Sequence, residues 1–229
     1  MKQWISETLI NFEELLLPAN VDHDVLIELC DPTFQENLLV YGPPGTGKSV
    51  LCSAIAAKRC GANSLSDLRD YVWFYDCKNK NMRQSVNGQR LLSSCSISSF
   101  NDCGAMFIFD EIDELTEGQQ KELTEFINAA NRSTGVTILA TTNVNLNIPA
   151  EAKRISPALL SRFSYKQFLD TQVVYAYVQL VQRKLLDAKI SLSTEEIIEL
   201  MDDKFNYSDV SFRDVRSFVN LLIRRQKRQ

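Results

Sequence analysis

A short glycine-rich segment, Gly42-x-x-x-x-Gly47-Lys48-Ser49, is the part of this sequence whose residue types and spacing have the clearest chemical meaning. It lies between an apolar run at 38–41 and a helical pattern. Glycines in such a turn let backbone N–H groups point toward phosphate groups, and the amino terminus of the following helix attracts their negative charge. The spacing places Lys48 to reach the β- and γ-phosphates and the Ser49 hydroxyl to bind Mg²⁺. The segment therefore predicts a nucleotide-binding loop.

Two carboxylates follow directly after another apolar run, and the first of them, Asp110, stands 62 positions beyond Lys48. Because open parallel sheets bind ligands at the carboxyl ends of their strands, Asp110 and Glu111 are expected beside the phosphate loop. Asp110 is predicted to hold Mg²⁺, through water, and Glu111 to polarise a water molecule for in-line attack on the γ-phosphorus. Asp113 and Glu114 are predicted to be solvated or to cap a helix.

These two motifs on one chain resemble those of the AAA+ ATPase family, and the likeness extends over about 17–225. Residues 42–49 resemble the family's Walker A loop, and residues 107–113 resemble its Walker B strand. The resemblance implies binding and hydrolysis of ATP with Mg²⁺ as cofactor. Residues 139–143 look like the family's sensor 1 segment, which implies that Asn143 orients the attacking water. A turn on the protein surface is the alternative interpretation for Asn143.

Two roles for arginine side chains are also implied by this resemblance. Residues 156–163 are similar to the segment that carries the arginine finger, which implies that Arg162 inserts into the ATP site of a neighbouring subunit. A local ion pair is the alternative role for Arg162, and Arg154 is a second candidate finger. The start of the last helix resembles sensor 2, so Arg213 is predicted to contact the γ-phosphate, with Arg216 as the alternative. The residues predicted to contact ATP are Gly42, Pro43, Pro44, Gly45, Thr46, Gly47, Lys48, Ser49, Val50 and Arg213.

Four apolar runs, alternating with helical patterns, are the elements that must position these side chains. Such near-continuous apolar strands are buried on both faces, which predicts an α/β fold with a parallel P-loop NTPase sheet flanked by helices. Strands are expected at 38–41, 71–75, 105–109 and 136–141, and helices at 4–17, 25–30, 49–60, 117–131, 171–187, 194–203 and 212–226. We therefore expect a nucleotide-binding domain with an N-terminal helical segment over 1–168, and a small all-helical lid domain over 169–229.

Composition limits the class of protein. The chain has 229 residues, 45% hydrophobic and 24% charged, which is typical of a globular protein. Its formal net charge of −4 gives no overall attraction for nucleic acid, although a local basic patch could provide one. Six cysteines without a Cys-x-x-Cys pair, and a single histidine, exclude a zinc motif and indicate reduced thiols. With no signal peptide and no run of ~20 apolar residues, a soluble cytoplasmic or nucleoid-associated protein is expected.

Three roles are compatible with this chemistry, and all need an oligomer if Arg162 acts in trans. A replication-type ATPase is favoured, because Ser161-Arg162-Phe163 resembles the Ser-Arg-Cys motif of clamp-loader subunits, with Phe163 replacing the cysteine. Initiator and helicase-loader proteins belong to the same branch, so DNA and replication-type proteins are the expected partners, with no membrane. The basic residues after the second strand are expected either to meet DNA phosphates or to form a solvated charged loop. They are Lys78, Lys80, Arg83 and Arg90.

The other two roles are a transposition or plasmid regulator that assembles on DNA, and a protein-remodelling chaperone. Remodelling members of the family resemble one another in an aromatic-Val-Gly pore loop, whereas residues 84–88 contain no aromatic side chain. Clamp-loader subunits carry a further helical collar domain, for which this sequence leaves no residues. A truncated piece, a minimal viral or mobile-element relative, and a module that assembles without a collar are all compatible with that difference.

Overall fold

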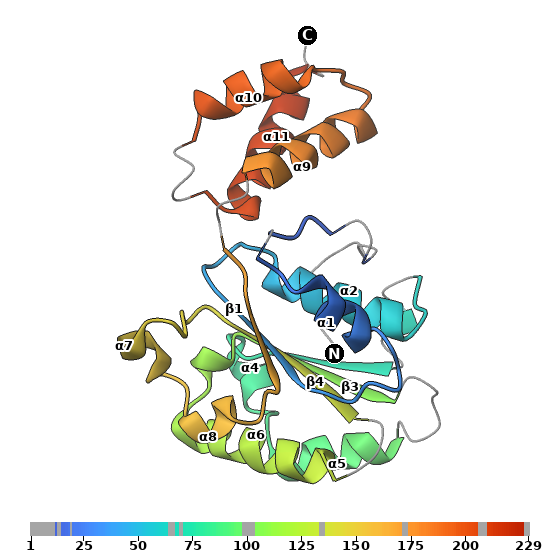
Figure 1. The fold of residues 1–229 in the computed structure, drawn as a ribbon, viewed down its shortest axis with the longest axis vertical. Coiled ribbons are helices and arrows are strands. Elements are labelled where there is room, and N and C mark those ends of the chain that lie inside the picture. Colours follow the sequence, from blue (N-terminus) through green and yellow to red (C-terminus); the bar gives the residue numbers. More distant parts are fainter. Residues whose placement is uncertain are drawn as a thin grey trace. The chain divides into compact units, whose positions relative to one another are not determined.

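A five-stranded parallel sheet, with strand order β2-β3-β4-β1-β5, is the centre of the computed structural model (Figure 1). The structure describes residues 12, 15–18, 20–63, 67–68, 71–97, 104–132, 136–170, 174–205 and 210–226. The strands are β1 (Leu38–Tyr41), β2 (Val72–Asp76), β3 (Ala105–Asp110), β4 (Val136–Thr142) and β5 (Tyr165–Phe168). The first four lie within one residue of their predicted bounds. β5 was not predicted, because this edge strand is only partly buried and carries polar residues.

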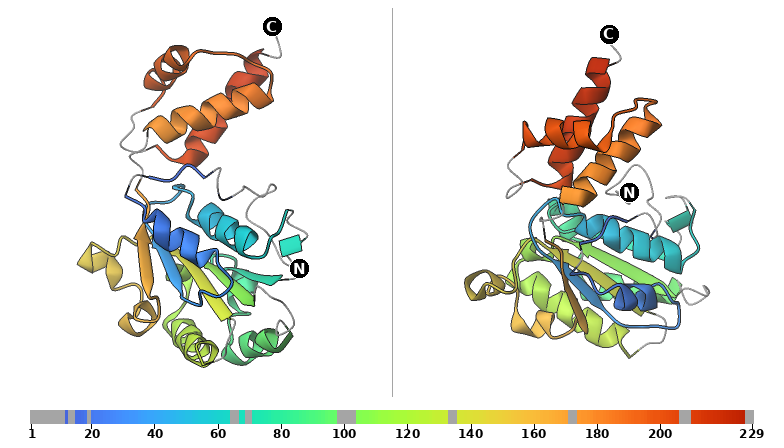
Figure 2. Two further views of the ribbon diagram at one scale, coloured as in Figure 1. Left: turned by 45° about the vertical axis from the view of Figure 1, so that its right-hand side comes forward. Right: turned by 45° about the horizontal axis from the view of Figure 1, so that its top comes forward.

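Helices cover both faces of the sheet, as Figures 1 and 2 show. α2 (Lys48–Arg59) lies on one face with α1 (His23–Leu29) beside it, and α5 (Gly88–Ile97) and α6 (Glu117–Ala130) lie on the other. All side chains of β1, β3 and β4 are buried, which explains why these strands read as unbroken apolar runs. The core beneath α6 includes stacked and edge-on aromatic rings, contributed by Phe107, Phe109 and Phe126.

Short helices occupy two stretches where the sequence predicted no regular structure. α4 (Lys80–Arg83) and α5 replace the charged loop expected between β2 and β3, and α7 (Pro149–Ala152) and α8 (Pro157–Leu160) precede β5. These helices were missed because most are single turns, too short for an apolar periodicity. Local signals still specify them. Asn79 caps α4 through its side chain, and Ser156 caps α8 immediately before Pro157, the favoured first residue of a helix.

The chain divides into two compact units. The first comprises Met1–Leu15, Val21–Gly42 and Lys48–Phe168, and the second comprises Leu16–Asn20, Pro43–Gly47 and Leu169–Gln229. The helices of the second unit are α9 (Val174–Asp187), α10 (Thr194–Asp202) and α11 (Phe212–Gln226). They pack around their own core, in which the buried Tyr177 hydroxyl donates to the Val210 carbonyl at 2.7 Å.

Two sequence-based expectations concern the amino terminus and membranes. Most of the helix predicted over 4–17 lies outside the described residues, and residues 15–17, which are described, are not helical. Within the described parts of the chain, no helix has both the length and the apolar character needed to cross a bilayer.

Candidate active site

Three loops meet at one edge of the sheet because the strands before them are neighbours. β4 lies between β3 and β1, and all three strands are parallel. The segments that follow Tyr41, Asp110 and Thr142 therefore leave the sheet at the same edge. Through this topology Lys48 and Ser49, the acidic pair and Asn143 are brought together.

Asp110 ends β3 as a buried carboxylate, with 8% of the residue exposed. The hydroxyls of Ser49 and Thr141 both donate to its Oδ1 atom, at 2.5 and 2.6 Å. Burial raises the pKa of this carboxyl above its ordinary value, and the two hydroxyl donors partly oppose that shift. A hydroxyl and a carboxylate oxygen at this separation are the hard ligands that Mg²⁺ prefers. Ser49 and Asp110 therefore fit the predicted metal-binding role.

Thr141 was not singled out from the sequence, although it lies within the predicted sensor segment. In the β3–β4 register Phe109 pairs with Ala140, so Asp110 and Thr141 are the next residues along these two neighbouring strands. The fully buried Thr141 donates to Asp110 and also accepts a hydrogen bond from the Glu111 backbone N–H at 3.0 Å. It thus fixes both members of the acidic pair.

Glu111 adopts a left-handed backbone conformation, with φ 57° and ψ 56°, that non-glycine residues rarely occupy. Such a conformation costs about 1–3 kcal/mol and concentrates at functional sites. The Glu111 carboxylate accepts a hydrogen bond from Asn143 Nδ2 at 3.0 Å, and its other oxygen lies 3.7 Å from Lys78 Nζ. The predicted base is therefore held in a fixed orientation at the end of β3, in contact with the predicted sensor residue.

Lys48 begins α2 and is 5% exposed. Its Nζ atom donates to the Gly42 carbonyl at 2.9 Å. Burial lowers the pKa of Lys48 from 10.5 to about 8, although Asp110 and Glu111 act in the opposite direction. The amine is thus held against the Gly42 carbonyl, with the acidic pair nearby.

Backbone conformation explains why the loop carries glycine at positions 45 and 47. Gly45 has φ 79° and Gly47 has φ 93°, both in the region that L-amino acids with side chains avoid. No described atom lies within 4 Å of the place where a Cβ atom of Gly47 would stand. The requirement at Gly47 is therefore one of backbone conformation, as expected for a loop that turns its N–H groups toward phosphate.

Asp113 corrects a sequence-based expectation, since its side chain is buried, with 3% exposed, rather than solvated. Its Oδ1 accepts hydrogen bonds from the Thr142 hydroxyl at 2.8 Å and from the Asn143 backbone N–H at 3.2 Å. Its Oδ2 lies 3.3 Å from Arg154 Nη2, in an ion pair. Asp113 therefore supports the predicted sensor segment, and Arg154, the second candidate finger, pairs within its own chain.

Arg162 lies in the turn after α8 and makes a hydrogen bond of 3.4 Å from Nη1 to the neighbouring Ser161 hydroxyl. Among the described residues no ion pair involves Arg162, and its buried Nε has no hydrogen-bond partner. The local ion pair considered as the alternative role is thus not observed in this part of the chain. Arg213 and Arg216 are both exposed on α11 of the second unit. Their role as sensor 2 stays a prediction.

Comparison with known proteins agrees with this arrangement. The family "ATPase family associated with various cellular activities (AAA)" matches residues 38–171, more than half of the chain. A putative cell division cycle ATPase of Plasmodium falciparum is 30% identical over 147 residues, which cover 57% of this chain and 11% of that protein. Replication factor C subunit 3 of Blastobotrys adeninivorans is 25% identical over 189 residues, covering 81% of this chain and 49% of that protein.

The chain thus spans about half, or far less, of the length of these relatives. Among solved structures, domain III of the replication initiation protein DnaA from Thermotoga maritima superposes with a TM-score of 0.66 at 17% identity. That match covers 95% of this chain and 89% of the DnaA domain, and it shows a shared fold. Because the family match includes the phosphate loop, the acidic pair and the sensor segment, the chain belongs to the AAA family of ATPases.

Proposed function

We propose that this ATPase works as an oligomer in which Arg162 of one subunit completes the ATP site of the next. The observation that carries the proposal is the contrast between two parts of the chain. Glu111, Asn143 and Asp110 are joined by hydrogen bonds to one another or to shared partners. Arg162, by contrast, has neither an ion pair nor an Nε partner among the described residues. An arginine of this kind is suited to an anion supplied by another molecule.

Each side chain then has a distinct task in ATP hydrolysis. Lys48 and the loop N–H groups bind the β- and γ-phosphates. Ser49 and Asp110 hold Mg²⁺, which when bound neutralises charge on the phosphates. Glu111 accepts a proton from the attacking water, and its contact with Asn143 keeps the carboxylate aimed at that water. Arg162 of the neighbouring subunit stabilises the charge that develops on the γ-phosphate, a contribution of about 10³–10⁵ in rate for known fingers.

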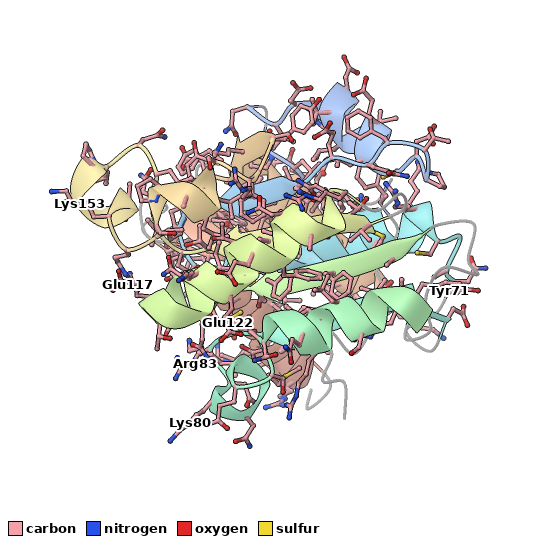
Figure 3. The ribbon with its side chains drawn as sticks, turned by 90° about the horizontal axis from the view of Figure 1, so that it is seen from below. Tyr71, Lys80, Arg83, Glu117, Glu122 and Lys153 are labelled. Carbon is pink, nitrogen blue, oxygen red and sulfur yellow. The ribbon has the colours of Figure 1, made fainter. Side chains whose placement is uncertain are left out.

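We further propose a DNA-associated, replication-type role. Its support is the similarity to a replication factor C subunit and the fold shared with a replication initiation protein. Because the chain is acidic overall, DNA must meet a local basic surface. Exposed Lys80 and Arg90, on the neighbouring helices α4 and α5, are the candidates. Figure 3 shows Lys80 and Arg83 on α4, and Arg83 is already paired with Glu114 at 3.9 Å.

Steady-state ATP turnover over a dilution series, with primed DNA, duplex DNA or an unfolded protein, tests both proposals. We expect specific activity to rise with protein concentration, DNA to stimulate it, and Arg162→Ala to remove most of it. Constant specific activity down to monomeric concentrations would exclude a finger in trans. Stimulation by unfolded protein alone would replace the DNA-associated role with protein remodelling. Filaments seen on duplex DNA with ATP, in a separate imaging experiment, would indicate a transposition-type regulator.

The DNA contact has its own matched pair of variants. Lys80→Ala with Arg90→Ala should reduce stimulation by DNA while leaving turnover without DNA unchanged, because neither side chain is part of the site. A control double variant at Lys121 and Lys153, exposed lysines on α6 and just after α7, should leave the stimulation by DNA intact. Equal losses in the two double variants would indicate a general charge effect rather than a binding surface.

A further inference from the structure

Asn37, the residue immediately before β1, is a buried amide whose side chain is fully hydrogen-bonded. It is 2% exposed. Its Oδ1 accepts from the Ile138 backbone N–H at 3.0 Å, and its Nδ2 donates to Asn131 Oδ1 at 3.1 Å and to the Arg162 carbonyl at 3.2 Å. A primary amide has two N–H donors, and both are used. One small side chain thus joins β4, the end of α6 and the residue predicted to be the finger.

The backbone around Arg162 is attached to the start of β1 at more than this point. The Asn37 carbonyl accepts from the Tyr165 N–H at 3.2 Å, and the Ser164 hydroxyl donates to the Glu36 carboxylate. Phe163, between Arg162 and Ser164 in the chain, is buried. The main chain from Arg162 to Tyr165 is therefore fixed against the residues that lead into the strand before the phosphate loop. At Arg162 itself the side chain is less constrained, since its Nε is buried without a partner among the described residues.

We propose that Asn37 is a positioning residue for Arg162. Its amide fixes the carbonyl, and hence the Cα atom, from which the finger extends toward the γ-phosphate of a neighbouring subunit. This inference rests on the proposed action of Arg162 in trans. Misplacing a catalytic group by about 1 Å can cost about 10² in rate, so loss of this anchor should reduce turnover at the neighbouring site.

Asn37 could instead serve only to hold its own subunit together, since buried amides normally satisfy their partners. The two explanations differ in which ATP site is affected. A purely structural defect acts on the subunit that carries the substitution. A misplaced finger acts on the site of the next subunit, which has an intact sequence.

Mixed oligomers of two inactive variants separate these sites. The donor carries Glu111→Gln, which cannot hydrolyse ATP but presents Arg162, and the acceptor carries Arg162→Ala, whose own site is intact. Turnover in the mixture comes from acceptor sites that receive a donor finger. We expect Asn37→Ala in the donor to reduce this turnover by about tenfold or more. In the acceptor the same substitution should reduce it by less than about threefold, because the amide acts mainly through the finger of its own subunit.

Two variants keep the test informative. Asn37→Asp retains the acceptor for Ile138, loses both donors and adds a negative charge facing the Asn131 and Arg162 oxygens, so in the donor it should reduce turnover at least as much as Asn37→Ala. Asn131→Ala removes only the other Nδ2 partner and should leave the donor's activity near its starting value. Thermal unfolding measured for each variant shows how far stability alone changes.

The outcomes are distinguishable. An inactive mixture of the two starting variants would overturn the action of Arg162 in trans, and the role of Asn37 with it. An active mixture in which Asn37→Asp has no effect in the donor, or equal effects in donor and acceptor, would overturn the role of Asn37 alone. A loss with Asn131→Ala as large as that with Asn37→Ala would show that the amide acts through α6 rather than through Arg162.

Discussion

Removing the Asp113 carboxylate should damage both stability and catalysis, whereas removing its ion-pair partner Arg154 should do less. Asp113 is 3% exposed and accepts from the Thr142 hydroxyl and the Asn143 backbone N–H. Asp113→Ala leaves both donors without a partner, and Thr142, which supplies the first of them, is fully buried. Removing Arg154, whose side chain is 54% exposed, leaves Asp113 with both of these donors.

The expected magnitudes follow from these burials. Each unsatisfied buried donor costs about 1–3 kcal/mol, so the loss of two partners in Asp113→Ala should lower the free energy of unfolding by about 2–6 kcal/mol. The Arg154–Asp113 ion pair is exposed only on its arginine side, and Asp113 keeps its two donors without it, so Arg154→Ala should cost less, about 1–2 kcal/mol. Asp113→Asn keeps an oxygen acceptor for the two donors and loses only the charge. Its loss of stability should therefore lie between those of Arg154→Ala and Asp113→Ala.

Denaturant unfolding, combined with steady-state ATP kinetics, measures these effects. Asp113→Ala should lower kcat by about tenfold or more with a smaller change in KM, because Asn143 contacts Glu111, the proposed general base, rather than the loop proposed to bind ATP. Arg154→Ala should retain nearly normal kcat. The reasoning is refuted if Arg154→Ala destabilises the protein as much as Asp113→Ala does. Wild-type kcat in a folded Asp113→Ala variant would equally refute it.

Three further predictions concern the site itself. Glu111→Gln should bind ATP normally and lower kcat by about 10² or more, checked by nucleotide titration and turnover, since the amide cannot accept a proton. Asn143→Ala should lower kcat with little effect on ATP affinity, by the same two measurements, because the carboxylate loses its donor. With the pKa of Lys48 at about 8, ATP affinity in magnesium-free buffer should fall about tenfold from pH 7 to pH 9, because the ammonium group deprotonates over this range. Calorimetric titration at each pH measures the affinity. The fall should be absent in Lys48→Arg, whose guanidinium stays charged.

The sheet could be predicted because its central strands carry their own signal. β1, β3 and β4 are buried along their whole length, and a buried strand is apolar whatever its neighbours are. β5 is also paired in parallel with β1, but Lys166 and its neighbours remain partly exposed at the edge. Its place in the sheet depends on pairing with a strand more than 100 positions earlier, and no local pattern in the sequence expresses that dependence.

The candidate site likewise has a part that the sequence predicts and a part that it does not. Lys48, Ser49, Asp110 and Glu111 could be chosen from the sequence because each lies in a short motif directly after a strand, and parallel strands bring such motifs to one edge. The residues that hold these side chains in place could not be chosen from the sequence, because their contacts depend on strand register. Thr141 meets Asp110 only because β3 and β4 pair as they do. The burial of Asp113 likewise follows from the path of the chain after β4, which no residue near Asp113 specifies.

Asn37 is the extreme case, since its side-chain partners stand 94, 101 and 125 positions away. From the sequence it is one polar residue before an apolar strand, with no motif of its own. In the structure it is an amide whose oxygen and both N–H donors are hydrogen-bonded, and removing it would leave several groups without partners at once. A residue of this kind is recognised by burial and by hydrogen bonding rather than by type or spacing. For this ATPase, the residues that position the proposed catalytic groups must therefore be sought in the structure, whereas the proposed catalytic groups themselves lie in motifs of the sequence.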